Sequence, residues 1–173
     1  MHTTIRPASD EYAPYYEKYI AKVAEGDILK ILTAQGDEVR ALFANIPADR
    51  AQFAYAPGKW TLSESLLHVI DTERVFAYRA LRIGRGDVTP LAGFEQNDWV
   101  PLSGANDRGL SSLLDEFSAA RAATVALFSG LPADAWARRG TASNYPVTVR
   151  ALAFKCAGHC QHHVSLFRER YLA

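Results

Sequence analysis

Apolar residues recur every three or four positions in four stretches of the chain, with polar residues between them. This spacing places the apolar side chains on one face of an α-helix. The first stretch runs from Asp27 to Asn45, and Pro47 disfavours helical backbone beyond it. Gln35 falls on the apolar face, whose other members are Ile28, Ile31, Leu32, Val39, Leu42, Phe43 and Ile46.

The second stretch carries the clearest start signal. Thr61 is followed three residues later by Glu64, the spacing of a capping box that satisfies free backbone N–H groups at a helix start. Gly84 and Gly86 favour termination at the other end. The apolar stripe between them consists of Leu62, Leu66, Val69, Phe76 and Ala80.

Two further helices are predicted, one over Leu110–Ser129 and one from Thr148 to about Tyr171. Asn106 or Asp107 is the expected start signal of the former. Thr148 is the expected N-cap of the latter. The stripe of the third helix consists of Leu110, Leu113, Leu114, Phe117, Thr124 and Phe128. The stripe of the fourth consists of Val149, Leu152, Ala153, Cys156, Cys160, Phe167 and Tyr171.

No segment alternates apolar and polar residues with a period of two, so no strand is predicted. Four amphipathic helices without strands are typical of an all-α four-helix bundle. We expect a single domain over residues 1–173, with residues 1–26 forming an N-terminal arm or a short helix. The connection from Gly84 to Gly109 is roughly 25 residues long, and long loops in compact domains are often functional.

Composition and charge narrow the function. The chain has 173 residues, a hydrophobic content of 49%, a charged content of 22% and no net charge. No basic cluster stands out, which argues against a nucleic-acid partner. No apolar run is long enough to span a membrane, and the N-terminus lacks the apolar core of a signal peptide. We therefore expect a cytoplasmic protein with a small-molecule substrate.

Two histidines on the predicted fourth helix have the spacing of metal ligands. His159 and His163 are four residues apart, so they share one helix face at about 6 Å. Because both side chains face the core, their ring nitrogens need hydrogen-bond partners or a metal. The spacing turns His162 outward. Two such ligands and one from another helix leave a coordination position open, as in catalytic metal sites.

Spacing alone does not decide which residue is the third ligand. His68 lies on the flank of the second helix's stripe, which indicates a boundary residue, whereas Glu73 lies in its middle and competes for the role. Asp71, one turn after His68, either orients an imidazole, handles a proton or is a solvated surface acid. Cys156 and Cys160 extend too far along the helix to complete one site with the histidine pair, so we interpret them as small core residues.

Other side chains give weaker signals. Trp60 and Trp99 either wall a pocket or pack in the core. Arg121 lies beside an apolar face, so it either meets an anionic substrate or extends its guanidinium to solvent. His2 has no predicted role. No serine or cysteine has the neighbours of a covalent nucleophile.

Three segments together resemble motifs of the DinB/YfiT-like superfamily of metal-dependent enzymes. They are GKWTLSESLLHVID at 58–71, TPLAGFEQNDW at 89–99 and HCQHH at 159–163. The resemblance covers the chain from about Asp27 to Tyr171 and implies a four-helix bundle in up-down-down-up order. It also implies one divalent ion, commonly zinc or nickel, whose ligands here are His68, His159 and His163.

The resemblance also shapes the expected chemistry. It makes Glu73 a buried acid beside the site instead of a ligand, and Asp71 and Glu73 are the candidate catalytic residues. Several members are thiol S-transferases or isomerases that use bacillithiol or mycothiol, and members are often dimers. Val69 stands where some members have a second histidine, which is not a ligand. The residues that we expect to bind the thiol or substrate are Glu95, Gln96, Asn97 and Asp98.

The sequence therefore predicts a metal-dependent S-transferase that joins a small thiol to electrophilic small molecules. Two alternatives remain. One is a metal-dependent hydrolase that uses the same site, and the other is a non-catalytic stress-response protein that binds a metal or small ligand.

Overall fold

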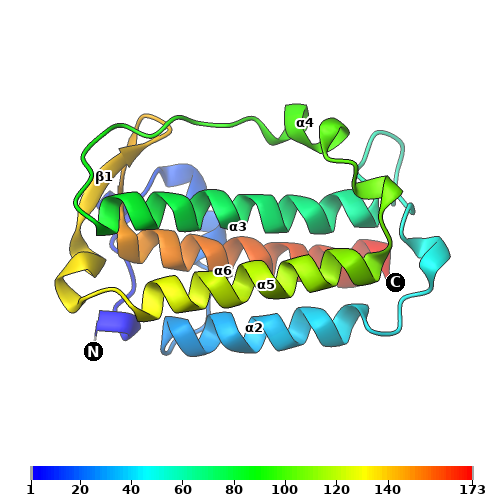
Figure 1. The fold of residues 1–173 in the computed structure, drawn as a ribbon, viewed down its shortest axis with the longest axis horizontal. Coiled ribbons are helices and arrows are strands. Elements are labelled where there is room, and N and C mark those ends of the chain that lie inside the picture. The colour runs from blue at the N-terminus through cyan, green and yellow to red at the C-terminus, as the bar shows by residue number, and fades with distance from the viewer. Residues whose placement is uncertain (1, 173) are drawn as a thin grey trace.

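The computed structural model describes residues 2–172, and its core is a bundle of four long helices that lie side by side (Figure 1). The chain passes up α2, down α3 and α5, and up α6, so that α3 and α5 run parallel (Figure 1). Each of these helices packs against two of the others. The predicted all-α class and up-down-down-up order are confirmed. The bounds are Ile28–Phe43 for α2, Leu62–Gly84 for α3, Leu110–Ser129 for α5 and Val149–Leu166 for α6.

Shorter elements surround the bundle. The N-terminal segment contains α1, Glu17–Ile20, which packs against α6. The long connection contains α4, Gln96–Trp99. A two-stranded sheet is formed by β1, Arg139–Ala142, and β2, Tyr145–Thr148, and a π-helical turn, Phe167–Tyr171, extends α6. Single 3₁₀ turns occupy His2–Thr4, Ser9–Glu11, Pro14–Tyr16, Ala48–Arg50, Val100–Leu102, Ala105–Asp107 and Ala133–Ala137.

Two of the predicted helix starts are confirmed. The Thr61 hydroxyl accepts a hydrogen bond from the Glu64 amide at 3.1 Å, and the Glu64 carboxylate accepts one from the Thr61 amide at 2.8 Å. Thr148 caps α6 by accepting from the Ala151 amide at 3.0 Å. These local bonds satisfy N–H groups that have no partner within the helix.

The predicted start signal of α5 is wrong. The N-cap of α5 is Gly109, which offers no capping side chain, and both Asn106 and Asp107 lie in the preceding 3₁₀ turn. Asn106 instead supports the start of α3. Its side-chain carbonyl accepts from the Thr61 hydroxyl at 2.7 Å, and its amide donates to Glu64 at 3.0 Å.

The hairpin of β1 and β2 corrects the prediction that the chain has no strands. Each strand is four residues long, too short for a period of two to stand out in the sequence. Ser143 and Asn144 form the turn at φ values of 53° and 65°, a left-handed region where glycine is the usual signal. The hairpin also anchors the long connection, because Leu91 exchanges backbone hydrogen bonds of 2.9 and 3.0 Å with Thr141 and Ser143.

A layer of buried polar side chains separates two apolar clusters in the bundle core. The Arg121 guanidinium donates to both oxygens of Glu73 at 2.8 and 2.7 Å, and to the Leu32 carbonyl at 2.7 Å. Gln35 donates to the Ala157 carbonyl at 3.0 Å in the same layer. Arg121 is therefore paired within the core, and the prediction that it extends to solvent is wrong.

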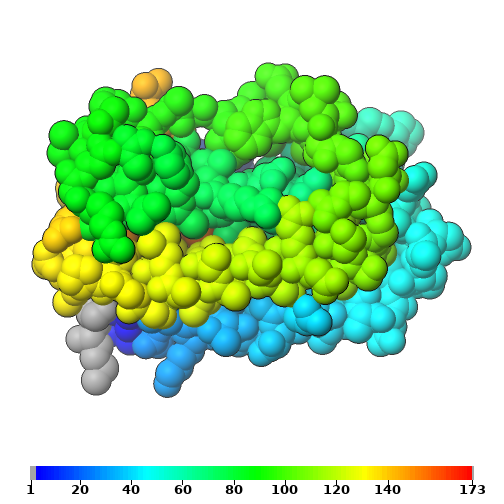
Figure 2. All heavy atoms as spheres, in the orientation of Figure 1, coloured from blue at the N-terminus to red at the C-terminus, as the bar shows by residue number. Residues whose placement is uncertain are grey.

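The connection between α3 and α5 runs lengthwise over the outside of α3 and carries α4 (Figure 1). It must return the full length of α3, about 35 Å at 1.5 Å per residue, because α5 begins at the same end as α3. In space-filling view the connection forms a ridge along one edge of the molecule, with hollows between it and the helix below (Figure 2).

None of the helices within residues 2–172 combines the length and apolarity needed to cross a membrane.

Candidate metal centre

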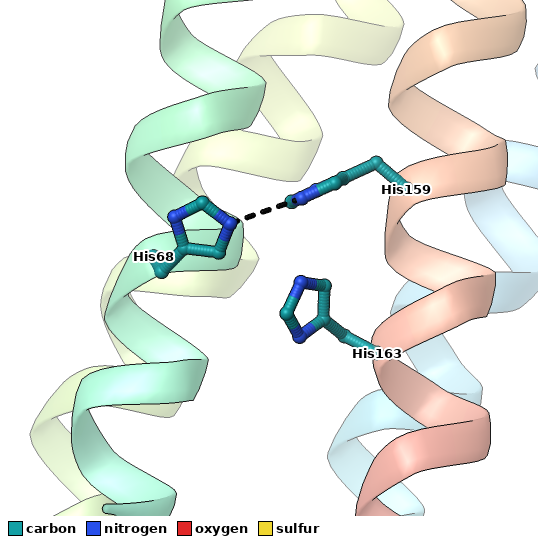
Figure 3. Close-up of side chains that lie close together, drawn as sticks. All are labelled: His68, His159 and His163. Carbon is teal, nitrogen blue, oxygen red and sulfur yellow. Dashed lines mark hydrogen bonds between the residues drawn. The ribbon is translucent and has the colours of Figure 1, made fainter. Parts of the chain in front are cut away.

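His68 on α3 faces His159 and His163 on α6 across the interface of the two helices (Figure 3). The Nε2 atoms of His68 and His159 are 3.1 Å apart. Each of the three rings offers one nitrogen, and these nitrogens all lie within 4.8 Å of one another. The structure thus brings together the three histidines that the family resemblance implies as ligands.

All three imidazoles are buried, although helical spacing alone indicated that His68 is a boundary residue. The side chain that covers it comes from outside α3. Trp60, just before the helix, places its indole 4.8 Å from the His68 ring, centroid to centroid. On the other side Tyr19, from α1, lies edge-on to His159 at 5.5 Å. Periodicity within one helix cannot report such cover from other segments.

The close approach of α1 to the histidines depends on a glycine. A Cβ atom on Gly158 would lie 2.2 Å from the carbonyl oxygen of Tyr19. Only glycine therefore allows the backbone of α1 to lie directly on α6 beside His159. This contact seats Tyr19 against the site.

Burial keeps the three imidazoles neutral. It lowers the pKa of His68 to about 4, with a smaller contribution from His162. Burial also holds the pKa values of His159 and His163 well below the usual 6.5, and the neighbouring imidazoles lower them further. A neutral imidazole keeps a lone pair free, which is the form that binds a metal.

Two hydroxyl groups hold the far sides of the rings. The Nδ1 atom of His163 lies 3.3 Å from the Ser65 hydroxyl, and that of His68 lies 3.4 Å from the Thr72 hydroxyl. When Nδ1–H donates to such an acceptor, the Nε2 lone pair is left for the centre of the cluster. Neither role was predicted from the sequence. Thr72 lies one turn after His68 on the same flank of α3, and this spacing could have indicated its contact with the His68 ring.

The donor set fits a divalent transition metal. With metal–nitrogen bonds of 2.0–2.1 Å, two ligands of a tetrahedral ion lie about 3.3 Å apart, close to the separation of His68 and His159. The donor nitrogen of His163 lies within 4.8 Å of the other two. Three uncharged nitrogen donors favour ions such as zinc, copper or nickel over calcium or magnesium, which prefer oxygen.

A polar cavity of about 300 Å³ opens beside His163. It lies between α6, the segment before α3 and the connection that carries α4. Trp60 lines this cavity. Trp99, the other tryptophan that the sequence suggested as a pocket wall, lines a different cavity. No aspartate or glutamate of the described chain lines the cavity beside His163. The residues that line this cavity are Tyr19, Tyr55, Gly58, Lys59, Trp60, Ser65, Asn97, His162, His163, Leu166 and Tyr171.

The four predicted thiol-binding residues are placed differently from one another. Asn97 lines the cavity. Glu95 is the N-cap of α4 and accepts from the Asn97 side chain at 2.9 Å. Gln96 and Asp98 do not line this cavity. Only Asn97 of this group is therefore in reach of a molecule bound beside His163.

The two acids suggested for catalysis are not part of the histidine cluster, and each is paired with an arginine. Asp71 lies 3.5 Å from Arg74 on the outer side of α3, where partial burial raises the pKa of its carboxyl. Both oxygens of Glu73 are held by Arg121. Glu73 is therefore a buried structural acid in this arrangement, as the family resemblance implies, and not the third ligand.

The remaining candidates lie outside the cluster. Cys156 and Cys160 are buried free thiols, consistent with their interpretation as core residues. His162 is half-buried and is not one of the three clustered histidines, but its ring lies 5.2 Å from those of Tyr19 and His163, and it lines the cavity beside His163. The side chain of His2 lies outside the described residues.

A sequence model of the DinB superfamily matches residues 31–167, a range that contains all three clustered histidines. The chain belongs to the DinB superfamily. Among solved structures, this DinB-superfamily chain is similar to YfiT from Bacillus subtilis, described as "a probable metal-dependent hydrolase with an unusual four-helix bundle topology". The match has a TM-score of 0.76 at 15% identity and covers 92% of this chain and 91% of YfiT, which shows a shared fold. No curated protein sequence matches the chain.

Proposed function

We propose that this protein is a metal-dependent S-transferase that holds one divalent ion, zinc or nickel, through His68, His159 and His163. The observation that carries the proposal is the cluster of three buried, neutral imidazoles beside a polar cavity. Three protein ligands leave a coordination position open for a reacting molecule.

The lining of the cavity favours a thiol as the nucleophile. A bound ion of this type lowers the pKa of a coordinated water or thiol. No carboxylate lines the cavity within the described residues, so no carboxylate is placed there to take a proton from a coordinated water, and His162 is the base that the lining offers for that step. A free thiol has a pKa of about 8.5, far below that of water, and needs no such base to ionise near a cation.

The cavity also supplies groups to bind the thiol's polar parts. Lys59 places an ammonium group in the lining, and Asn97 offers an amide from the connection. Trp60 and Tyr55 provide aromatic walls. These side chains suit a polar, low-molecular-weight thiol such as bacillithiol or mycothiol. Its thiolate sulfur would form a bond to the electrophilic carbon of a small molecule as the leaving group on that carbon departs.

A hydrolase is the second candidate, because the structurally similar YfiT is described as a probable metal-dependent hydrolase. The same cluster would then activate water. As a third possibility the fold would bind a metal or small ligand without turnover, as a stress-response protein does.

One experiment separates these functions. The metal-loaded protein is assayed for conjugation of bacillithiol and of mycothiol to monochlorobimane, and for hydrolysis of a panel of esters and amides. We expect conjugation with one of the thiols, lost in His163→Ala and on treatment with a chelator, but retained in Thr124→Val, at a buried position of α5 that does not line the cavity. Chelator-sensitive hydrolysis without conjugation would establish the hydrolase instead, and stoichiometric metal without either activity would leave a binding protein.

We further propose that the protein acts in the cytoplasm as a homodimer, in keeping with the family resemblance. Light scattering of the purified protein tests whether it is a homodimer. A mass of about twice the chain's 19.1 kDa is expected, and a monomer would contradict it.

A further inference from the structure

A second cavity, of about 360 Å³, lies between α3 and residues 89–99 of the long connection. The short helix α4 contributes to both cavities: Asn97 lines the one beside His163, and Trp99 lines this one. The connection forms its roof and is fixed there, because Leu91 is bonded to the β-hairpin. The cavity is therefore built into the fold and independent of the histidines.

One wall is a pair of aromatic rings. Phe94 and Trp99 lie 4.8 Å apart, centroid to centroid, with their planes tilted by 31°. Trp99 is 43% exposed, unusually high for a tryptophan in a folded chain. Val75 and Leu91 add apolar surface. Such a wall suits a flat apolar group.

A buried cation lies beside this wall, with the central carbon of the Arg79 guanidinium 5.8 Å from the centroid of the Phe94 ring. Arg79 is only 2% exposed, and its Nη2 donates to the Ala92 carbonyl at 2.7 Å and to Ser143 at 3.0 Å. The Tyr16 hydroxyl also interacts with the guanidinium, whose Nη1 is buried without a well-formed hydrogen bond, and no carboxylate within residues 2–172 forms an ion pair with Arg79. A buried charge without a counter-ion is costly, and burial indeed lowers the pKa of Arg79.

The surrounding charges leave that cation unbalanced. Arg82 also lines the cavity, but it is paired with Asp87. Lys155 is buried nearby with its ammonium over the Tyr16 ring at 3.3 Å, and burial together with Arg79 lowers the pKa of Lys155 to about 7. No aspartate or glutamate lines the cavity in the described chain. The site thus has a positive interior and an aromatic rim.

We propose that this cavity binds a small aromatic carboxylate, with the carboxylate on Arg79 and the ring against Phe94 and Trp99. The Arg79 guanidinium is already oriented by the Ala92 carbonyl and Ser143, so little ordering is needed on binding. An anionic acceptor supplies the counter-ion that the fold lacks, through a charge-assisted hydrogen bond.

The test is calorimetric titration with benzoate, using benzyl alcohol as an uncharged probe of similar shape. We expect the wild type to bind benzoate at least ~10-fold more tightly than benzyl alcohol, and Arg79→Gln to lose that preference. Benzyl alcohol binding in Arg79→Gln shows whether the cavity is intact in that variant. Ser143→Ala, which removes a tether of the guanidinium but not its charge, should keep the preference for benzoate.

Arg82→Gln is the matched control, since it removes a cation of the same cavity that already has a partner. It should keep the preference for benzoate over benzyl alcohol, as should His163→Ala, because the histidine cluster takes no part. Equal binding of the two probes by the wild type, wild-type benzoate affinity in Arg79→Gln, or an equal loss in Arg82→Gln would overturn the proposal.

Discussion

The Nε2 atoms of His68 and His159 lie 3.1 Å apart although 91 residues separate them in the chain. The antiparallel packing of α3 against α6 produces this meeting, and His163, one turn further along α6, completes the cluster. Burial of all three rings leaves them neutral and aimed at one point, the arrangement from which the proposed metal binding follows.

The hydroxyl groups behind the rings should tune the affinity for the metal. We expect Thr72→Val and Ser65→Ala each to weaken zinc binding by about 10–100-fold, because a ring that loses its Nδ1 partner is less well oriented and less basic. Competition with a chromophoric chelator measures the change. Thr124→Val, the same substitution at a buried position of α5, should leave affinity unchanged; an equal loss there would assign the effect to packing.

The metal-free protein should lose stability as the pH falls. The pKa of His68 is about 4 in the folded chain and near 6.5 when unfolded, so the unfolded chain binds more protons between these values. The free energy of unfolding should therefore decrease from about pH 6.5 towards pH 4, by up to ~1.4 kcal/mol per pH unit for each such histidine. Urea titrations measure it, and an unchanged slope in His68→Asn would contradict the assignment.

The ion pair of Glu73 and Arg121 should matter for stability and not for the metal. Glu73→Gln leaves a buried guanidinium without its counter-charge and should cost about 3–5 kcal/mol of unfolding free energy. Metal stoichiometry should stay at that of the wild type. Asp71→Asn, at a partly exposed pair with Arg74, should cost less than about 1 kcal/mol. Loss of the metal in Glu73→Gln with little change in stability would instead make Glu73 a ligand.

The sequence predicted those features that depend on neighbouring residues along the chain. The capping box of Thr61 and Glu64, the cap at Thr148 and the shared face of His159 and His163 follow from the geometry of one helix. The β-hairpin was missed because its strands are short and its turn uses Ser143 and Asn144 instead of glycine.

What the sequence could not predict depends on contacts between segments. His68 looked like a boundary residue because Trp60, which covers it, does not belong to the helix. Arg121 looked like a surface residue because its partner, Glu73, lies on another helix. For the same reason neither Arg79 nor Ser65 was singled out. The family resemblance supplied His68 where spacing within one helix could not.

The metal content of the purified protein and its variants tests the central claim most directly. Elemental analysis after loading with zinc or nickel should find about one ion per chain in the wild type and in His162→Ala, because His162 is not one of the three clustered donors. His159→Ala and His163→Ala should each lose stoichiometric binding. Full occupancy in either of these two variants would contradict the three-histidine centre.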